Sequence, residues 1–170
     1  MRSFALAIAT LLLLSSCTDD PGLIEPEPSA SQPPTMSAQA KENNPEGVAA
    51  FVRHYVAVFN FASNTGRVRE LSRLSDSTCG GCQSYIELFR TTYMNGGYFR
   101  DGEWKLSDYE LEIKSASTIV FVHVSAPAGR TRETESAPES TTKPEDSELL
   151  FEVDTSSDRY RVIRFERTAG

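Results

Sequence analysis

The chain has 170 residues, of which 39% are hydrophobic and 24% are charged, and its formal net charge at pH 7 is −7. This length suits one ordinary domain with flanking segments. The acidic balance argues against nucleic acid as a partner, because basic patches supply most of a protein's affinity for phosphate backbones. It also argues against a domain that lies flat on anionic lipid.

The first seventeen residues follow the pattern of a bacterial lipoprotein signal. Arg2 precedes an apolar run, and Leu14-Ser15-Ser16-Cys17 places a leucine three residues before a cysteine. The run is too short to stay in the membrane as a spanning helix, which takes about 20 residues. We predict a signal peptide over residues 1–16 and a lipid group such as palmitate on Cys17. That lipid would hold the protein at the extracytoplasmic face of the cell membrane. An ordinary signal peptide with a chance cysteine is the alternative.

Residues 17–43 are predicted to form a lipidated cysteine followed by a disordered linker. Five prolines occur there among small and polar residues, and few large apolar side chains offset the entropy of ordering. A stalk is the simplest role for such a segment. A proline-rich ligand for a partner protein is the alternative, although no PxxP run with basic flanks occurs.

The single folded domain is predicted over residues 44–168 and begins with a long helix. Asn44 is a favourable N-cap residue, and Pro45 has the backbone geometry of a first helical position. Apolar residues then recur at helical spacing on one face as far as Phe59, so the helix should end near residues 60–63.

Two further helices are expected before the chain changes to strands. A turn at residues 64–66 leads into a short helix over residues 68–74. After a polar turn, the next helix begins near Cys82 and ends at Gly96-Gly97, because glycine commonly closes a helix.

Beyond residue 97 the apolar period changes to two, which predicts strands. We expect them near residues 98–99, 104–113 with a bulge at Ser107-Asp108, 118–125, 149–153 and 160–165. The polar, proline-containing segment 126–147 is predicted to be a disordered loop between two strands. Helices followed by a meander of about four strands indicate the α+β class, with the helices packed on a curved antiparallel sheet.

The opening of the domain carries a resemblance to a known fold. Residues 51–60, the glycine-containing turn after them and Leu71 resemble the start of the nuclear-transport-factor-two-like superfamily, which includes SnoaL-like and ketosteroid-isomerase-like domains. That resemblance implies a cone in which a curved sheet wraps around the first helix. More narrowly, residues 44–104 are similar to an uncharacterised family of actinobacterial lipoproteins, which implies fold and location rather than chemistry.

Cys79 and Cys82 are the two cysteines outside the lipoprotein signal. In an exported chain a disulfide between them is the default. Their CxxC spacing at a helix start also fits a thiol redox pair, because a helix N-terminus lowers a thiol pKa. A polar turn precedes them instead of a buried strand, so we predict a structural disulfide. His54 and His123 do not lie at finger spacing from the pair, and we predict no metal and no cofactor.

The predicted cone would enclose a pocket between its first helix and its sheet. The side chains expected to line it are Tyr55, Phe59, Trp104, Phe121, His123 and Phe151. The same side chains could instead fill the interior without a void. We therefore predict a non-catalytic binding domain of the cell envelope, whose partner is an envelope protein or a small apolar ligand.

An enzyme is the alternative function. The superfamily resemblance implies that Tyr55 lies where ketosteroid isomerases place an oxyanion-hole tyrosine. The expected base is not reproduced, because Asp76 lies in a polar turn, and His123 is the nearest polar residue to the second acid's position. An open pocket on which Tyr55 converges with Asp76, Asp108 or His123 would favour this alternative.

Arginines are interleaved along the last predicted strand and just before it: Arg159, Arg161, Arg164 and Arg167. Charges of this kind protect an edge strand from pairing with other chains. We interpret them as a solvated edge, with an anion-binding site as the alternative.

Overall fold

The structure is a computed structural model that describes residues 32–157 and 159–168. The chain divides into two units, Met1–Ser31 and Gln32–Gly170, and the description below concerns the second. The predicted signal peptide, Cys17 and the first part of the predicted linker lie outside the described residues. No helix within the described residues is long and apolar enough to cross a membrane.

Three α-helices and a short 3-10 helix form the first half of the domain: η1 Gln39–Lys41, α1 Pro45–Thr65, α2 Arg69–Leu74 and α3 Gly80–Met94. The predicted cap is confirmed, since the Asn44 side chain accepts a hydrogen bond from the Gly47 backbone N–H at 2.7 Å. Helix α1 runs further than expected. It ends only at Gly66, whose φ of 70° closes the helix in the left-handed conformation.

The ordered domain begins before residue 44, which corrects the expected start. Ala40 in η1 is 1% exposed and belongs to the core, and Met36 packs against that core. The Tyr160 hydroxyl donates a hydrogen bond to the Glu42 carbonyl oxygen at 2.7 Å. One small buried residue and a few backbone contacts order this segment, so its composition alone did not reveal it.

Seven strands form two antiparallel sheets within the described residues. Their bounds are β1 Gly96–Arg100, β2 Lys105–Ile113, β3 Ser117–Ala126, β4 Arg130–Thr134, β5 Ser140–Thr141, β6 Glu145–Asp154 and β7 Arg161–Arg167. The larger sheet has the order β2-β3-β6-β7 and confirms the predicted four-stranded meander. The predicted bulge is also present, because the β2–β3 register shifts between Ser107 and Glu110 and Asp108 adopts a φ of 53°.

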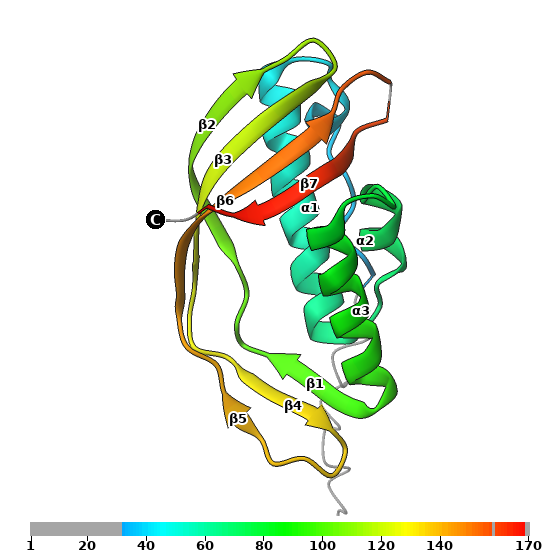
Figure 1. Ribbon diagram of the computed structural model, residues 1–170, viewed down its shortest axis with the longest axis vertical. Coiled ribbons are helices and arrows are strands. Elements are labelled where there is room, and N and C mark those ends of the chain that lie inside the picture. Colours follow the sequence, from blue (N-terminus) through cyan, green and yellow to red (C-terminus); the bar gives the residue numbers. More distant parts are fainter. Residues whose placement is uncertain (1–31, 158, 169–170) are drawn as a thin grey trace, which may run out of the picture. The chain divides into compact units, whose positions relative to one another are not determined.

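The segment predicted to be a disordered loop, residues 126–147, instead forms β4, β5 and the ends of two long strands. Together with β1 these strands make a second sheet of order β1-β4-β5, which lies near the C-terminal ends of α1 and α3 (Figure 1). The pairing brings Tyr98 opposite Arg132. Backbone hydrogen bonds hold this sheet, and they need no apolar side chains. The polar composition was therefore misread as disorder.

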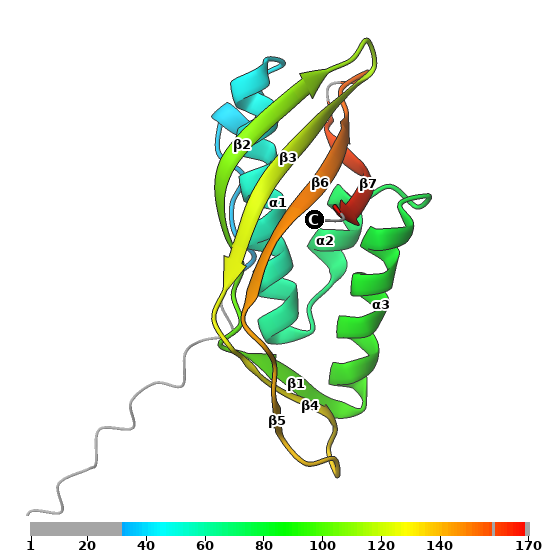
Figure 2. The ribbon, with the colours of Figure 1, turned by 60° about the vertical axis from the view of Figure 1, so that its left-hand side comes forward.

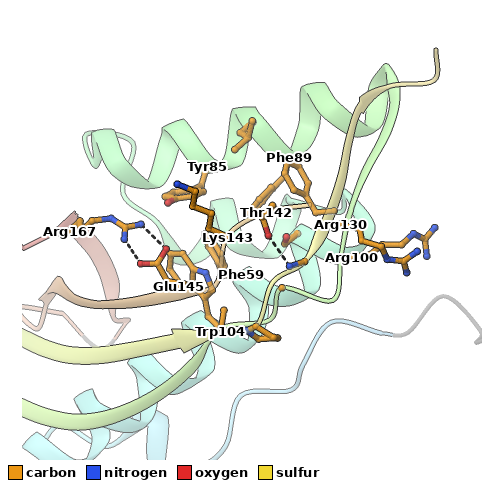
Figure 3. A pocket seen from close by; sticks show the side chains of 17 residues that line it. Phe59, Tyr85, Phe89, Arg100, Trp104, Arg130, Thr142, Lys143, Glu145 and Arg167 are labelled. Atoms are coloured by element: carbon orange, nitrogen blue, oxygen red, sulfur yellow. Dashed lines mark hydrogen bonds and ion pairs between the residues drawn. The ribbon is translucent and has the colours of Figure 1, made fainter. Parts of the chain in front are cut away.

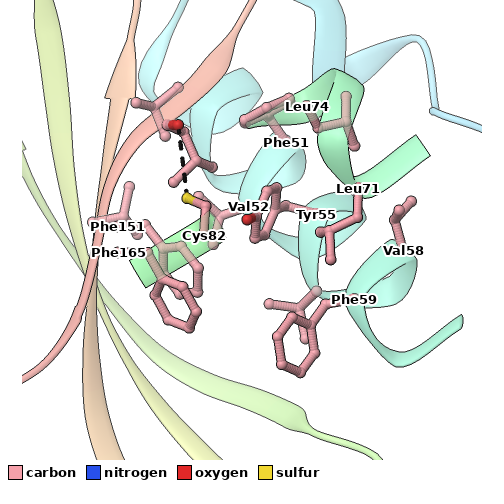
Figure 4. Packing of buried hydrophobic residues seen from close by; sticks show 14 of the residues in the cluster. Phe51, Val52, Tyr55, Val58, Phe59, Leu71, Leu74, Cys82, Phe151 and Phe165 are labelled. Atoms are coloured by element: carbon pink, nitrogen blue, oxygen red, sulfur yellow. Dashed lines mark hydrogen bonds between the residues drawn. The ribbon is translucent and has the colours of Figure 1, made fainter. Parts of the chain in front are cut away.

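The helices cover one face of the larger sheet, which curves along α1 (Figures 1 and 2). Val120, Val122 and Val124 point from β3 into the core and are 0% exposed. Figure 4 shows Phe151 and Phe165 of this sheet facing the side chains of α1. Their rings stack with centroids 4.8 Å apart. This packing confirms the α+β class with helices on a curved antiparallel sheet.

Candidate functional site

A cavity of about 220 Å³ opens between the C-terminal half of α1, helix α3 and the small sheet (Figure 3). Its aromatic lining comes from four parts of the chain: Phe59, Tyr85, Phe89, Phe99 and Trp104. Charged side chains surround its mouth: Arg100, Arg130, Lys143, Glu145 and Arg167. The segment 126–147 supplies much of the wall, so the cavity depends on the sheet that the sequence did not predict.

The aromatic lining is centred on Phe59 of α1. The Phe59 ring stacks on Trp104 with centroids 4.4 Å apart, and it meets the edges of Tyr85 and Phe89 at 5.0 Å each. Phe89 in turn contacts Phe99 of β1 at 5.5 Å. Offset-stacked and edge-to-face contacts of this kind hold rings in fixed orientations. The floor of the cavity is therefore a rigid apolar surface.

Hydrogen bonds to the backbone fix the frame around these rings. The Tyr93 hydroxyl donates to the Ser63 carbonyl oxygen at 2.7 Å and lies 3.2 Å from that of Phe99, which ties α3 to both α1 and β1. The Asn60 side-chain amide pairs with both backbone groups of Trp104. The two elements that carry Phe59 and Trp104 are thus joined directly.

The charged residues at the mouth fall into two groups (Figure 3). Lys143, Glu145 and Arg167 lie on one side. Arg167 forms a two-pronged ion pair with Glu145, and this hydrogen bond is the main reason why the Glu145 pKa lies below its usual range. Arg100 and Arg130 lie on the other side, where the Arg130 Nε donates to Asp101 at 2.8 Å. Among the described residues, Lys143 and Arg100 form no ion pair with a carboxylate.

The structure places the predicted pocket residues in three different environments. Phe59 and Trp104 line the cavity. Tyr55 and Phe151 are 1% and 0% exposed and belong to the packed core instead, with ring centroids 5.8 Å apart. These two side chains therefore fill the interior, which corrects their assignment to the pocket.

Phe121 and His123 lie on the opposite face of the larger sheet, which also corrects their assignment. They alternate along β3 with the inward-facing valines, and His123 Nε2 is 3.1 Å from Asp146 Oδ1. Both faces of β3 carry apolar residues, so alternation alone did not show which face is covered.

The structure does not bring together the groups that an isomerase-like enzyme would use. The Tyr55 hydroxyl lies 2.9 Å from Ser75 Oγ inside the core, where burial raises its pKa to about 12. Asp76 accepts hydrogen bonds from the backbone and side chain of Thr78, and these lower its pKa. Asp108 lies at the bulge of β2. Neither carboxylate lines the cavity, and Tyr55 does not reach it.

Cys79 and Cys82 are joined in a disulfide, with Cα atoms 5.3 Å apart. Both residues are 1% exposed. The loop that holds them is fixed to β7 at the edge of the larger sheet by two contacts. The Asp76 N–H donates a hydrogen bond to the Val162 carbonyl oxygen at 2.8 Å, and Gly81 packs against the Phe165 carbonyl oxygen. A thiol substrate needs access to a redox disulfide, so this burial favours the structural interpretation.

The two histidines have different neighbours, since His123 contacts Asp146 and His54 lies near Glu70 and Arg73. His54 is buried between α1 and α2, where burial lowers its pKa and Nε2 has no hydrogen-bond partner. Across residues 32–157 and 159–168, no three His, Cys, Asp or Glu side chains gather closely enough to hold a metal ion.

Sequence reasoning missed most of the cavity. Tyr85 and Phe89 were not among the predicted pocket residues, although their spacing of four residues places them on one side of the third helix. Lys143 fell in the segment interpreted as disordered, and Arg167 was interpreted as part of a solvated edge. The feature of the sequence that could have indicated this cavity is the group of aromatic residues on the first and third helices.

A protein-family profile described as "Family of unknown function (DUF6318)" matches residues 27–156. The chain belongs to the DUF6318 family. No curated protein matches it.

Two solved structures share the fold of this DUF6318 domain at low sequence identity, and a third shows a weaker similarity. The intermembrane space region of chloroplast protein ARC6 is 13% identical with a TM-score of 0.52, covering 81% of this chain and 100% of that one. The Kfla4162 protein from Kribbella flavida is 13% identical with a TM-score of 0.50, covering 75% and 93%. An NTF2-like protein with a cystatin-like fold from Novosphingobium aromaticivorans is 13% identical with a TM-score of 0.40, covering 73% and 88%.

Proposed function

We propose that this DUF6318 protein is a lipid-anchored protein of the cell envelope, of the actinobacterial lipoprotein type, whose domain binds a small apolar ligand without catalysis. The observation that carries the binding proposal is the open cavity floored by Phe59 and Trp104. A pocket with aromatic walls and a few polar groups at its mouth is the usual form of a small-molecule site.

The size of the cavity limits the part of the ligand that can enter. A volume of about 220 Å³ equals the space of about seven water molecules at roughly 30 Å³ each. One or two aromatic rings, or a short alkyl group, would fill it. Burial of apolar surface contributes about 25 cal/mol per Å², so such a group supplies useful affinity.

Acid–base chemistry has little support in this cavity. Among the described residues that line it, Glu145 is the one carboxylate, and Arg167 already holds it as an anion. A carboxylate with a lowered pKa is a weak base, and its oxygens are engaged by the guanidinium. These contacts favour binding over proton transfer.

The lipid anchor is proposed from Leu14-Ser15-Ser16-Cys17. Its test is to express the natural chain and the Cys17→Ser variant in a bacterium supplied with radiolabelled palmitate. We expect label on the natural chain and none on the variant. Equal labelling of both chains would remove the anchor from the proposal, and with it the membrane as a partner through Cys17.

The binding proposal is tested with the sole tryptophan of the chain as a reporter. The full-length protein, labelled with 5-fluorotryptophan and held in phosphatidylcholine nanodiscs, gives a single protein resonance in fluorine NMR. Titration with neutral 2-naphthylmethanol should shift that resonance in a saturable manner. Ser63→Met, which adds a side chain to the cavity lining, should weaken this binding, whereas Ser84→Met on the exposed face of α3 should not.

A resonance that does not move in the natural chain would contradict the cavity proposal. The envelope protein predicted as the other partner would then become the ligand to seek, through a surface of the domain instead of its cavity. Equal shifts in both serine variants would show that the probe binds elsewhere.

A further inference from the structure

We infer that the ligand is an organic anion, with an aromatic or short alkyl group in the cavity and a carboxylate or phosphate group beside Lys143. This inference rests on the proposed function, because it names the class of ligand that the same cavity takes. It is supported by the set of charged side chains around the mouth of the cavity. A purely apolar ligand would need only the aromatic floor.

Positive charge collects at this mouth in a chain that is acidic as a whole. Four of the cavity's lining residues are cationic and one is a carboxylate, whereas the full chain carries a net charge of −7. Arg167 is neutralised by Glu145, and Arg130 by Asp101. The positive charge of Lys143 has no such partner among the described residues. An anion attracted to the mouth would therefore meet an unpaired ammonium group.

Lys143 is better placed than Arg100 to meet the ligand. The Arg100 guanidinium lies over the Tyr98 ring, 4.9 Å from its centroid, on the side of the mouth away from Glu145 (Figure 3). Lys143 lies on the same side as Glu145 and Arg167. Figure 3 also shows Tyr85 on this side, above Phe59. An anion beside Lys143 would thus leave its apolar part over the rings of the floor.

Tyr85 supplies a second group for the anion. The Tyr85 side chain lies close enough to Arg167 to contribute to the raised pKa of the guanidinium, after the larger effect of Glu145. The Tyr85 O–H is able to donate, and this side chain lines the cavity. A charged acceptor forms the stronger hydrogen bond with such a donor. Lys143 and Tyr85 therefore recognise the same anionic group, one by charge and one by hydrogen bonding.

The volume of the cavity selects a small anion over a membrane lipid. A phospholipid carries two long acyl chains, and about 220 Å³ does not accommodate them. We therefore assign the ligand to soluble, single-tailed carboxylates or phosphate esters. A lipid source is retained as an arm of the test.

The experiment compares 2-naphthoate with neutral 2-naphthylmethanol, using the fluorotryptophan reporter in full-length protein in phosphatidylcholine nanodiscs. The natural chain should bind the anion about threefold to fivefold more tightly than the alcohol, the range expected of an exposed ion pair. Lys143→Gln should remove this preference, because it should weaken binding of 2-naphthoate about threefold to fivefold relative to binding of the alcohol. Lys41→Gln removes the same unit of charge outside the cavity lining and should leave both affinities unchanged.

Each outcome decides the inference. If the natural chain binds both probes with equal affinity, or if the two lysine variants lose equal affinity for 2-naphthoate, the ligand is not selected as an anion by Lys143. The proposed binding function of the cavity would remain in place. Failure of both probes to bind would overturn the proposed function and the inference together. Replacement of phosphatidylcholine by phosphatidylglycerol should leave the reporter unmoved. A shift there that Lys143→Gln abolishes would assign the anion to a lipid and overturn the soluble source.

Discussion

The side-chain amide of Asn60 and the backbone of Trp104 form a closed pair of hydrogen bonds. Asn60 Nδ2 donates to the Trp104 carbonyl oxygen at 2.9 Å, and the Trp104 N–H donates to Asn60 Oδ1 at 3.0 Å. Asn60 comes directly after Phe59, whose ring stacks on Trp104. One helical turn of α1 thus fixes both the indole and its stacking partner at the floor of the cavity.

Replacement of Asn60 by alanine should destabilise the domain and loosen Trp104. Two partly buried hydrogen bonds are lost, and the Trp104 backbone groups lose their partner, so we expect a cost of about 1–3 kcal/mol in the free energy of unfolding. Urea unfolding followed by tryptophan fluorescence measures this cost. Asn64→Ala is the matched control, because it removes one exposed hydrogen bond to Glu103 and should cost under about 0.5 kcal/mol. Equal costs for the two variants would show that the Asn60 pair does not stabilise the domain.

Alanine at Gly66 should destabilise the domain through strain and a clash. Gly66 has a φ of 70°, and an added Cβ would lie 2.4 Å from the Tyr93 ring. We expect a loss of about 2 kcal/mol or more, measured by thermal or urea unfolding. Gly80→Ala is the matched control, because Gly80 begins α3 and a Cβ there meets no atom within 4 Å. That substitution should be neutral or stabilising by up to about 1 kcal/mol, and an opposite order of the two effects would contradict the structure.

The Tyr55 hydroxyl should make stability fall at high pH. Its pKa is about 12 in the folded protein and 10.0 in a model peptide, because burial disfavours the phenolate. The stabilising contribution is complete below pH 10 and is lost as pH rises toward 12, because the unfolded chain releases this proton first. The difference between these two pKa values corresponds to about 3 kcal/mol. Tyr55→Phe should cost about 1 kcal/mol at pH 7, since the hydrogen bond to Ser75 is lost while Ser75 keeps its bond to the Leu71 carbonyl oxygen. The stability of this variant should fall less steeply than that of the natural chain between pH 10 and 12. Parallel curves for the two proteins over that range would refute this account.

The Cys79–Cys82 disulfide should resist reduction in the folded state. Both residues are 1% exposed, so dithiothreitol followed by iodoacetamide should leave them unmodified in native buffer and modify both in urea. Mass spectrometry reads the result. The double variant Cys79→Ala/Cys82→Ala should lose about 2 kcal/mol of stability. The loss is modest because a disulfide that closes a short loop removes little conformational entropy from the unfolded chain. Rapid modification in native buffer would favour the redox alternative.

Local patterns were enough to predict the helical half of the domain. The cap at Asn44 and the apolar stripe of α1 depend on residues close together along the chain, whereas the end of α1 at Gly66 lies beyond the expected residues 60–63. The aromatic residues Phe59 and Trp104 were also predicted as pocket residues, because they stood out as large apolar side chains on the first helix and an early strand. The fold class followed from the order of helices and strands.

Tertiary structure decided the rest. A strand with apolar residues on both faces does not show which face is covered, so only the packing of α1 against Val120 and Val122 put Phe121 and His123 on the outside. The sheet formed by β1, β4 and β5 depends on backbone pairing between β1 and β4, whose paired residues are at least thirty positions apart, such as Gly96 opposite Thr134. These bonds leave no apolar pattern in the sequence, because every residue except proline carries the same backbone donor and acceptor. The wall of the cavity and its charged mouth therefore emerge only when the chain folds.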